Sequence, residues 1–323
     1  MALEQTLTDD FAHLTMQEYV EGETRDQFFD EFTLLGWMEK STAMKRIAGG
    51  SSIVERLNIA ENDQGGSYSG TDTFSNTPDE TIDHAYYDFS KYEWPITSGS
   101  EEVLRNRNSP AAYGNLWMEK ADIAMKSLRK RLNTDAQSDG TGNSGKNMEG
   151  LAIMIDSTTT YATLSRTTVA VWAANETAVG GALALDGANG MVRMYNDVSL
   201  GSGDEGQINA LFGTQNIVEA YEALLQNDMR FQSGGPGDGG FGRLTFKGKP
   251  FLWDRAATSG VLYYIANSTF KTLIQRDRDF FVTPIQNPEN GTAQSEVYLA
   301  HILLWIALVC VEPRRNGKLT GIS

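Results

Sequence analysis

The sequence predicts an α+β protein in which a long β-hairpin and a long helix come before a mixed α/β domain and a closing block of strands. Three observations support this prediction. Apolar residues recur with a period near two on both sides of a polar stretch at 61–78. A helical pattern follows at 111–132, and strand-like apolar runs fill residues 244–311. Because a two-stranded ribbon is marginal in water unless something covers it, these parts favour assembly with another copy over catalysis.

The composition restricts the class of protein. With 323 residues, 40% of them hydrophobic and 21% charged, the chain is long enough for a sizeable core and about two domains. Its net charge of −15 argues against a protein whose whole surface binds nucleic acid. Cys310 is the single cysteine, so we expect a reducing compartment and no disulfide, zinc cluster or redox pair. We expect no targeting signal and no membrane span, because the apolar run at 297–311 is shorter than the roughly 20 residues that a spanning helix needs.

The N-terminal part predicts an acidic arm followed by a β-ribbon. Residues 1–40 hold ten acidic and two basic residues. A short helix is predicted at 24–35, with Gly36 as the residue that ends it. Two sets of alternating residues mark the outgoing and the returning strand of the ribbon: Ile53, Leu57 and Ile59, then Tyr87, Phe89, Tyr92, Trp94 and Ile96. The tip between them, at 61–78, is rich in turn-forming residues.

A long basic helix is predicted after the ribbon. A helical turn at 98–109 comes before it, and its own apolar face is marked by Trp117, Ala121, Met125, Leu128 and Leu132. Its C-terminal half carries five basic residues: Lys120, Lys126, Arg129, Lys130 and Arg131. Cations are favoured near a helix C-terminus by the helix dipole. The pattern therefore leaves two interpretations open, a solvated basic face or a site for an anionic partner.

The remainder predicts a mixed domain and then consecutive strands. We expect a strand or short helix at 150–156, a strand at 167–172, a loop at 180–190, a helix capped by Thr214, and a glycine-rich loop at 233–242. Strands are predicted at 244–246, 250–254, 260–267, 280–284 and 297–311, with a short helical link at 270–276. The tail at 312–318 predicts a turn that ends the core.

No motif in the sequence predicts an enzyme. Residues 140–147 match the phosphate-binding P-loop except at the last position, where Asn147 replaces the hydroxyl residue that would bind magnesium. The stretch also follows a helix, whereas a P-loop follows a strand. A calcium-loop pattern starting at Asp135 fails because Lys146 stands where a glutamate is needed. The three histidines lie far apart: His13, His84 and His301. The sequence therefore predicts no catalytic, cofactor-binding or metal-binding residue, and no cofactor.

The order of the predicted parts resembles the major capsid proteins of tailed double-stranded DNA bacteriophages, which share the Hong Kong 97 fold. Local marks of the resemblance occur at 150–156, 166–172, 260–267 and 312–315. The resemblance implies five parts: an N-terminal arm at 1–42, an extended β-hairpin (E-loop) at 43–97, the spine helix of the peripheral domain at 98–149, the axial domain at 150–245, and closing strands shared by the axial and peripheral domains at 246–323.

The same resemblance implies a structural, non-enzymatic function. We expect self-assembly into pentamers and hexamers of an icosahedral head that encloses double-stranded DNA without binding it sequence-specifically. The resemblance implies scaffolding, portal and decoration proteins as partners, and no membrane partner is expected. The protein is expected in the virion capsid after assembly in the host cytoplasm. Some family members cross-link their subunits through a lysine on the E-loop, but the tip at 61–78 contains no lysine, so we expect no such bond here.

Two groups of residues are the candidates for contacts between subunits. Tyr68 and Phe74 are the only aromatic residues of the polar tip, and buried aromatic residues dominate interface energies. Lys126, Arg129 and Arg131 form the basic part of the long helix, and we expect them to meet the acidic residues of a neighbouring arm.

Two other functions stay open at this point. An encapsulin-like compartment that stores an enzyme would use the same fold. A soluble β-rich hydrolase or carbohydrate-binding protein would instead use an exposed tryptophan as a stacking platform, with Trp94, Trp172 and Trp253 as candidates.

Overall fold

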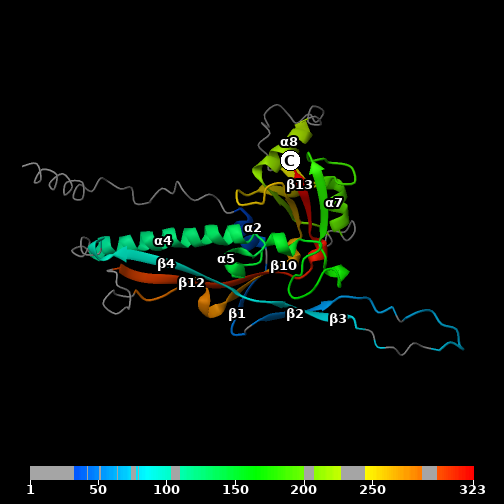
Figure 1. The fold of residues 1–323 in the computed structure, drawn as a ribbon, viewed down its shortest axis with the longest axis horizontal. Helices are drawn as coiled ribbons and strands as arrows, with labels where there is room; N and C mark the ends of the chain where they lie inside the picture. Colours follow the sequence, from blue (N-terminus) through cyan, green and yellow to red (C-terminus); the bar gives the residue numbers. More distant parts are fainter. Residues whose placement is uncertain are drawn as a thin grey trace, which may run out of the picture. The chain divides into compact units, whose positions relative to one another are not determined.

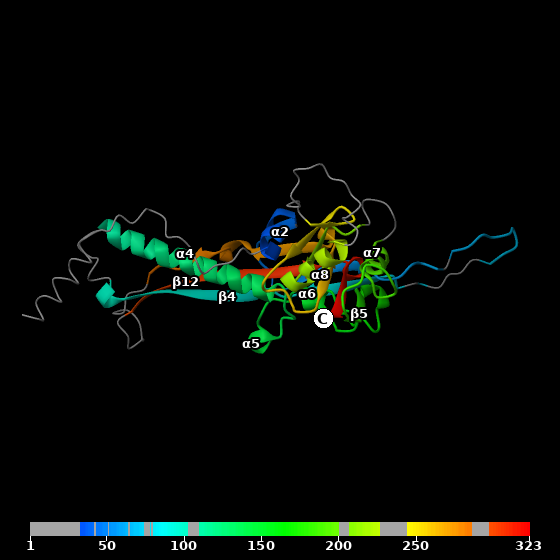
Figure 2. The same ribbon diagram turned by 90° about the horizontal axis from the view of Figure 1, so that it is seen from above.

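The computed structural model describes residues 33–41, 43–50, 52–63, 65–73, 78, 80–102, 110–199, 207–226, 244–285 and 297–323. All of them belong to one compact unit, Phe32–Ser323. They form three β-sheets, of five, six and two strands, with helices packed against the two larger ones (Figures 1 and 2).

The elements follow one another along the chain in three groups. The first group is α2 (Thr33–Ser41), β1 (Ala43–Ile47), β2 (Ile53–Asn58), β3 (Ile82–Tyr87), β4 (Ser90–Gly99) and α4 (Pro110–Asp135). The second is α5 (Gly142–Gly145), α6 (Leu151–Met154), the 3-10 helix η1 (Ala170–Trp172), β5 (Asn175–Gly181), α7 (Met191–Val198), β6 (Ala210–Gly213) and α8 (Gln215–Gln226). The third is β7 (Thr245–Phe246), β8 (Lys249–Trp253), β9 (Leu262–Ile265), η4 (Asn267–Thr269), β10 (Phe270–Gln275), η5 (Arg276–Arg278), β11 (Phe281–Val282), β12 (Val297–Cys310), η7 (Pro313–Arg315) and β13 (Gly317–Ile322).

The five-stranded sheet is built around β12, a strand of 14 residues. β4 pairs with one edge of β12 in antiparallel register over ten residues, while β10 and β11 share the other edge and β1 pairs in parallel with β10. The 26-residue helix α4 lies along β4 and β12 in both views (Figures 1 and 2). Leu128 and Leu132 of α4 belong to the same buried core as Ile302 and Leu304 of β12. The helix begins at Pro110, where the missing N–H has no intrahelical partner to lose.

The six-stranded sheet has the strand order β5-β13-β9-β6-β8-β7. β13 lies inside it, parallel to β5 and antiparallel to β9. Helices α7 and α8 contribute Met191 and Ile217 to a second buried core, which also contains Tyr264 and Leu319 from the strands. β5 and β13, the first and the last strand of this sheet along the chain, are therefore neighbours in it.

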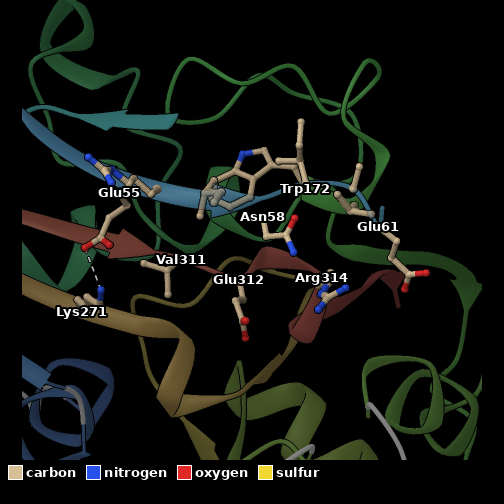
Figure 3. A pocket seen from close by; sticks show the side chains of 13 residues that line it. Glu55, Asn58, Glu61, Trp172, Lys271, Val311, Glu312 and Arg314 are labelled. Atoms are coloured by element: carbon tan, nitrogen blue, oxygen red, sulfur yellow. Dashed lines mark hydrogen bonds and ion pairs between the residues drawn. The ribbon is translucent and has the colours of Figure 1, made fainter. Parts of the chain in front are cut away.

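The hairpin of β2 and β3 is attached to the five-stranded sheet at its base. The Tyr87 hydroxyl donates a hydrogen bond to the Cys310 carbonyl at 3.1 Å, and the backbone N–H of Tyr86 donates to the Ala162 carbonyl at 3.1 Å. On the other strand, Glu55 forms an ion pair of 2.8 Å with Lys271 of β10 (Figure 3). The base is thus fixed by contacts on both strands, while the rest of the hairpin extends beyond them.

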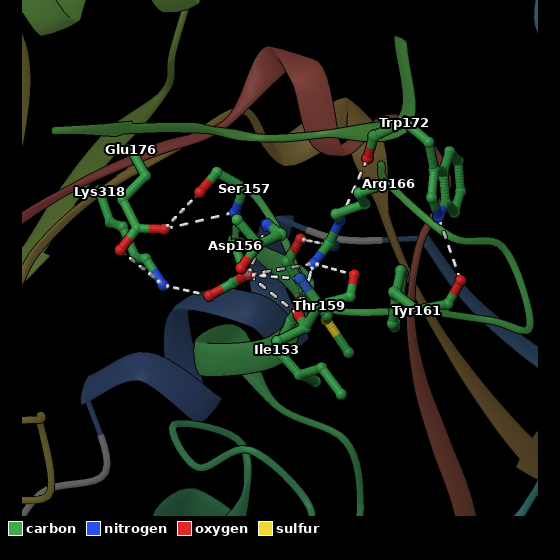
Figure 4. Close-up of polar contacts among 11 residues, drawn as sticks. Ile153, Asp156, Ser157, Thr159, Tyr161, Arg166, Trp172, Glu176 and Lys318 are labelled. Atoms are coloured by element: carbon green, nitrogen blue, oxygen red, sulfur yellow. Dashed lines mark hydrogen bonds and ion pairs between the residues drawn. The ribbon is translucent and has the colours of Figure 1, made fainter. Parts of the chain in front are cut away.

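A buried arginine organises the segment between the two larger sheets. The Arg166 side chain is fully buried, and its guanidinium donates hydrogen bonds to the carbonyls of Trp172, Ile153 and Met154 at 3.2, 2.8 and 2.7 Å (Figure 4). It also lies over the Tyr161 ring, 5.3 Å from its centroid. Because this guanidinium satisfies three main-chain carbonyls, the segment folds as α6 and η1 without a strand ladder of its own.

Tyr161 and Asp156 connect this cluster to both larger sheets. The Tyr161 hydroxyl accepts the backbone N–H of Cys310, at the end of β12, at 2.9 Å. Asp156 accepts a hydrogen bond of 2.9 Å from Lys318 of β13, and Lys318 also pairs with Glu176 of β5 at 3.4 Å (Figure 4). The polar cluster therefore bridges the five-stranded and the six-stranded sheet.

The Asp156 carboxylate is held in its charged form. Burial acts to raise the pKa of Asp156, but hydrogen bonds from the backbone of Thr159 and Thr158 and from Lys318 outweigh it and hold the pKa well below its usual range. A pKa that is lower in the folded than in the unfolded chain stabilises the fold at neutral pH. That contribution is lost as the pH falls from the unfolded-state pKa through the folded-state pKa.

Several predicted elements are confirmed. The helix expected at 111–132 is the larger part of α4, and the helix expected after Thr214 is α8, with Ile217, Val218 and Tyr221 buried as its pattern indicates. The short-helix alternative at 150–156 is α6. All five strands predicted at 244–311 overlap observed ones: β7, β8, β9, β11 and β12.

The returning arm of the ribbon is not one strand, and this prediction was wrong. β3 pairs with β2 and ends at Tyr87. Asp88 and Phe89 lie outside the strands, and β4, which begins at Ser90, pairs with β12. The residues Tyr92, Trp94 and Ile96 thus belong to the five-stranded sheet. Pairing with the long apolar strand β12 buries more surface than continuing a two-stranded ribbon, which explains the exchange of partner.

Four further predictions were wrong. Residues 167–172 form turns and η1, because Arg166 draws the Trp172 carbonyl back toward itself. Residues 270–276 are mainly strand β10, paired on both edges. The tail at 312–318 turns and then continues as β13. Gly36 does not end a helix, since α2 passes through it; most of the helix predicted at 24–35 lies outside the described residues.

We expect Arg166→Ala to lower the free energy of unfolding by about 3–5 kcal/mol, because it leaves three buried main-chain carbonyls without a donor. Urea denaturation measures this change. The matched control is Arg193→Ala on α7, where an exposed arginine pairs with Asp197 at 2.9 Å and about 0.5 kcal/mol or less is expected. A loss of under about 1 kcal/mol for Arg166→Ala would contradict the role given to this residue.

Candidate intersubunit surface

One face of the β2–β3 hairpin exposes three large apolar side chains beside Arg56, Asn58 and His84. Residues paired across an antiparallel hairpin lie on the same face. Val54 is paired with Tyr86, each of them 47% exposed, and Ile82 further along the same face is 65% exposed. The opposite face carries Ile53 and Leu57, which pack against the core. A soluble chain rarely leaves such a strand face uncovered, so this face is a candidate contact surface.

The residues of this face were not among those selected from the sequence. A signal for them was present, because apolar residues occupy both odd and even positions of the two arms, as in Ile53–Val54 and Tyr86–Tyr87. A strand with one buried face shows strict alternation, whereas apolar residues at consecutive positions indicate that both faces are covered. The core of the chain covers one face, and the described residues leave Val54, Ile82 and Tyr86 of the other face exposed.

The tip of the hairpin is polar and acidic. Tyr68 is 68% exposed there, and Phe74 lies outside the described residues. Asp72 shapes the turn beside Tyr68: its carboxylate accepts the backbone N–H of Ser69 at 2.6 Å, and its own N–H donates to the Ser69 carbonyl at 2.9 Å. Residues 61–80 contain five acidic residues and no basic one. The tip thus combines one exposed aromatic side chain with net negative charge.

The basic residues of α4 do not form a single site. Arg131 turns toward Asp135, which it contacts at 3.0 Å and which also accepts the Tyr92 hydroxyl at 2.8 Å. Lys126 pairs with Asp122, one turn earlier, at 2.9 Å. Arg129 is exposed and makes no ion pair with the described residues. Of the three residues predicted from the sequence, Arg129 is therefore the one best placed to meet another molecule.

Tyr68 of the tip and the basic residues of α4 are not brought together within one chain. Figures 1 and 2 both show the hairpin extending away from α4. Contacts between these two groups would therefore require a second copy.

A groove runs beneath the hairpin where it leaves the sheet (Figure 3). Its volume is about 510 Å³. One wall is β2 and its continuation, residues 55–61, and the other is formed by Val171, Trp172, Val311, Glu312 and Arg314, with Lys271 at one end. The predicted residues Tyr68 and Arg129 do not line it.

The motifs weighed in the sequence for catalysis or ligand binding can be compared with the described residues. No group of three or more His, Cys, Asp or Glu side chains among them is arranged to hold a metal ion. The P-loop-like stretch forms a left-handed turn, with Asn143 and Ser144 at φ values of 52° and 59°, and follows the end of α4. Trp172 is buried and donates its indole N–H to the Tyr161 carbonyl at 3.1 Å, so it offers no stacking surface.

The described part of the chain also has no helix long and apolar enough to cross a membrane.

Searches against protein-family models and against the curated proteins found no match. Solved structures do match. The chain is similar to a protein of the cyanophage A-1(L) capsid asymmetric unit, with a TM-score of 0.69 and 18% identity over 96% of this chain and 99% of the other. A capsid protein of a native GTA particle gives a TM-score of 0.64 at 12% identity, covering 97% and 99%. The SrpI encapsulin complex of Synechococcus elongatus PCC 7942 gives 0.59 at 10% identity, covering 98% and 95%.

These likenesses extend over nearly the whole length of each compared chain, at identities that establish the fold. The predicted α+β class, with an extended hairpin, a long helix beside a sheet and a mixed α/β part, is confirmed. The chain has the Hong Kong 97-like fold of phage capsid shells.

Proposed function

We propose that this chain is the major capsid protein of a tailed bacteriophage, a shell subunit that assembles into pentamers and hexamers around double-stranded DNA. The observation that carries the proposal is the match in fold, which covers 94% or more of this chain in capsid structures of several phages. In the proposed division, residues 1–42 are the arm, 43–97 the E-loop, 98–149 the spine segment, 150–245 the axial domain and 246–323 the closing strands.

The hairpin supplies a physical reason for assembly. Its apolar face, Val54, Ile82 and Tyr86, has no cover within the described chain and gains one from a neighbour. A contact between the hairpin of one copy and a different surface of the next is heterologous, and heterologous contacts close into rings when the rotation between copies allows it. Stable shell interfaces of this type bury roughly 2,000 Å² or more, which an extended hairpin lying over a neighbour supplies.

The charge of the chain is consistent with a container for DNA. A shell with a net charge of −15 per copy does not adsorb the genome over its whole inner surface, so DNA can be packed and released. The proposal includes location in the virion, assembly in the host cytoplasm, and separate scaffolding, portal and decoration proteins as partners. It includes no enzymatic activity.

The proposed contact residues fall into two groups. Tyr68 and Phe74 act as aromatic anchors of the hairpin tip on a neighbouring copy. Arg129, supported by Lys126, faces the acidic N-terminal segment of a neighbour, which carries ten acidic and two basic residues at 1–40. Arg131 was expected in the same role, but its contact with Asp135 gives it a function inside its own chain.

An encapsulin-like compartment is the second candidate function. The match to the SrpI encapsulin complex, over 98% of this chain, favours it, because the fold serves both kinds of shell. The TM-score to that structure, 0.59, equals that to the capsid of Myoviridae phage XM1 and is below the 0.69 to the cyanophage capsid protein, and this higher score is the reason for preferring the capsid. A hydrolase or sugar-binding protein is not favoured, since Trp172 is buried and Trp94 faces the core; Trp253 alone of the three is exposed.

Size-exclusion chromatography and electron microscopy of the purified protein test the shell proposal. We expect rings and closed particles, alone or after addition of a scaffolding protein from the same source. Mass spectrometry of native particles separates the two kinds of shell, because DNA and portal protein mark a virus and a packaged enzyme marks a compartment. A chain that stays a compact monomer at high concentration, with scaffold present, would rule out both.

Arg129→Glu should reduce particle formation at least tenfold without changing the free energy of unfolding, because it reverses an exposed charge that makes no ion pair among the described residues. Particle yield is read by sedimentation and stability by urea denaturation. Arg276→Glu, an exposed charge reversal on η5, serves as the control and should assemble normally. Normal yield from Arg129→Glu would remove this residue from the interface.

Deletion of residues 62–76 should leave a folded chain that forms no closed shells. The deletion removes Tyr68 and Phe74 but none of the contacts that fix the hairpin base, such as Tyr87 with Cys310. Circular dichroism should stay close to that of the parent, while electron microscopy should show no particles. Capsids of normal size and stability from the deletion variant would mean that the tip contributes nothing to assembly.

A further inference from the structure

Asparagine followed by glycine occurs three times in the sequence: at Asn189–Gly190, Asn290–Gly291 and Asn316–Gly317. In such a pair the main-chain nitrogen of the glycine can attack the side-chain carbonyl of the asparagine, because glycine has no Cβ to shield that nitrogen. Asn290 lies outside the described residues. The other two pairs lie in opposite surroundings, so the fold decides which of them can react.

The Asn316 side chain is held in one position inside the protein. It is buried, and its Oδ1 accepts the backbone N–H of Ala266 at 2.8 Å. Its Nδ2 donates to the Thr269 hydroxyl at 2.9 Å and to the Glu312 carbonyl at 3.1 Å. Turning this amide toward the nitrogen of Gly317 would break all three hydrogen bonds. Their loss slows the attack by about a hundredfold or more.

The Asn189 side chain has no such restraint. It is exposed in the loop 182–190 that precedes α7, and it makes no hydrogen bond with the described residues. The attacking nitrogen, that of Gly190, donates a hydrogen bond of 3.2 Å to the Gly187 carbonyl, which is at the long end of the normal range. The amide of Asn189 can therefore turn toward this nitrogen at little cost.

We propose that Asn189 is a site of spontaneous deamidation in the folded protein and that Asn316 is protected from it. The Gly190 nitrogen forms a bond to Cγ of Asn189, and the Cγ–Nδ2 bond breaks. The amide leaves as ammonia with the proton that the Gly190 nitrogen gives up. Water then opens the five-membered succinimide at either carbonyl, which yields aspartate or isoaspartate at position 189. The reaction needs a single copy and is independent of the proposed shell function.

The isoaspartate product adds one carbon atom to the main chain where the loop has no room for it. The backbone N–H of Met191 donates to the Ala184 carbonyl at 3.0 Å, which closes the loop. A Cβ on Gly190 would come within 2.5 Å of the Asp186 carbonyl oxygen, so the main chain is tightly packed there. Since Met191 belongs to the second buried core, a longer loop displaces the start of α7 and destabilises that core.

The aspartate product has a different effect. It leaves the length of the main chain unchanged and adds a negative charge just before α7. The dipole of a helix favours a negative charge at this end. The two products therefore change the stability of the protein in different ways.

Peptide mapping of the aged full-length protein tests the proposal. The protein is incubated in mildly alkaline buffer, and samples are digested and analysed by tandem mass spectrometry, which gives the deamidated fraction at each of the three asparagines. Labelling with an isoaspartyl methyltransferase identifies the isoaspartate. We expect Asn189 to lose its amide about a hundredfold or more faster than Asn316.

Two controls separate the effect of the fold from that of the dipeptide. In urea, where neither side chain has a fixed environment, Asn189 and Asn316 should react at similar rates. Asn189→Gln keeps an amide at the position, but its cyclisation needs a larger ring, so the methyl label should disappear from this peptide. Gly190→Ala is unsuitable as a control, because the added Cβ would collide with the Asp186 carbonyl.

Three results would overturn the assignment of Asn189. The first is equal rates at Asn189 and Asn316 in the folded protein. The second is a rate at Asn189 that rises about a hundredfold in urea, which would mean that the folded loop protects it. The third is a difference between the two sites that persists in urea, which would assign the selectivity to the local sequence.

The consequence for α7 has its own measurement. Ion-exchange chromatography separates the isoaspartate fraction, and its urea midpoint should lie below that of fresh protein, while the Asn189→Asp variant should keep the midpoint. An isoaspartate fraction as stable as fresh protein would show that the loop absorbs the extra atom and would overturn the effect on the second core.

Discussion

The buried guanidinium of Arg166 is the interaction on which the rest of the described fold depends. It lies where α6, η1 and the ends of the two larger sheets meet, and it satisfies carbonyls that no strand or helix ladder reaches. Through the stacked rings of Tyr161 and Trp172 the cluster contacts Cys310 of β12, and through Asp156 it contacts Lys318 of β13. A buried polar group needs hydrogen-bond partners at well-defined distances and angles. It therefore restricts the relative position of the two larger sheets more than apolar packing would.

The attachment of the hairpin to the five-stranded sheet determines which of its surfaces are exposed. Because Tyr87 and Glu55 hold the base on the five-stranded sheet, the direction in which the hairpin leaves is set by the core of its own chain. The hairpin then exposes three apolar side chains on one face, an edge of β2 without a second ladder partner among the described strands, and an acidic tip. In the proposed shell, identical neighbours around a ring would present the same set of surfaces to each copy.

The sequence allowed the elements with strong local signals to be predicted. α4 and α8 have regular apolar faces, and β12 is a long apolar run, so their patterns need no knowledge of the partner. β10 and β13 were not predicted because their strand conformation depends on pairing with segments that are distant in the sequence. β10 lies between β1 and β12, and β13 lies between β5 and β9. The exchange of partner between β3 and β4 likewise depends on the distant strand β12. Arg166, whose role depends on carbonyls up to 13 residues away, shows no local pattern of its own.

The position of β13 has a consequence for the order of folding during synthesis. β13 joins β5 to β9 in the six-stranded sheet, yet it follows every other described element in the chain. Until it emerges from the ribosome, β5 has no ladder partner among the described strands, and Lys318 is not available to Asp156 and Glu176. The six-stranded sheet of a nascent chain therefore stays incomplete until its last residues have been made, whereas the strands of the five-stranded sheet that hold the hairpin base are already present.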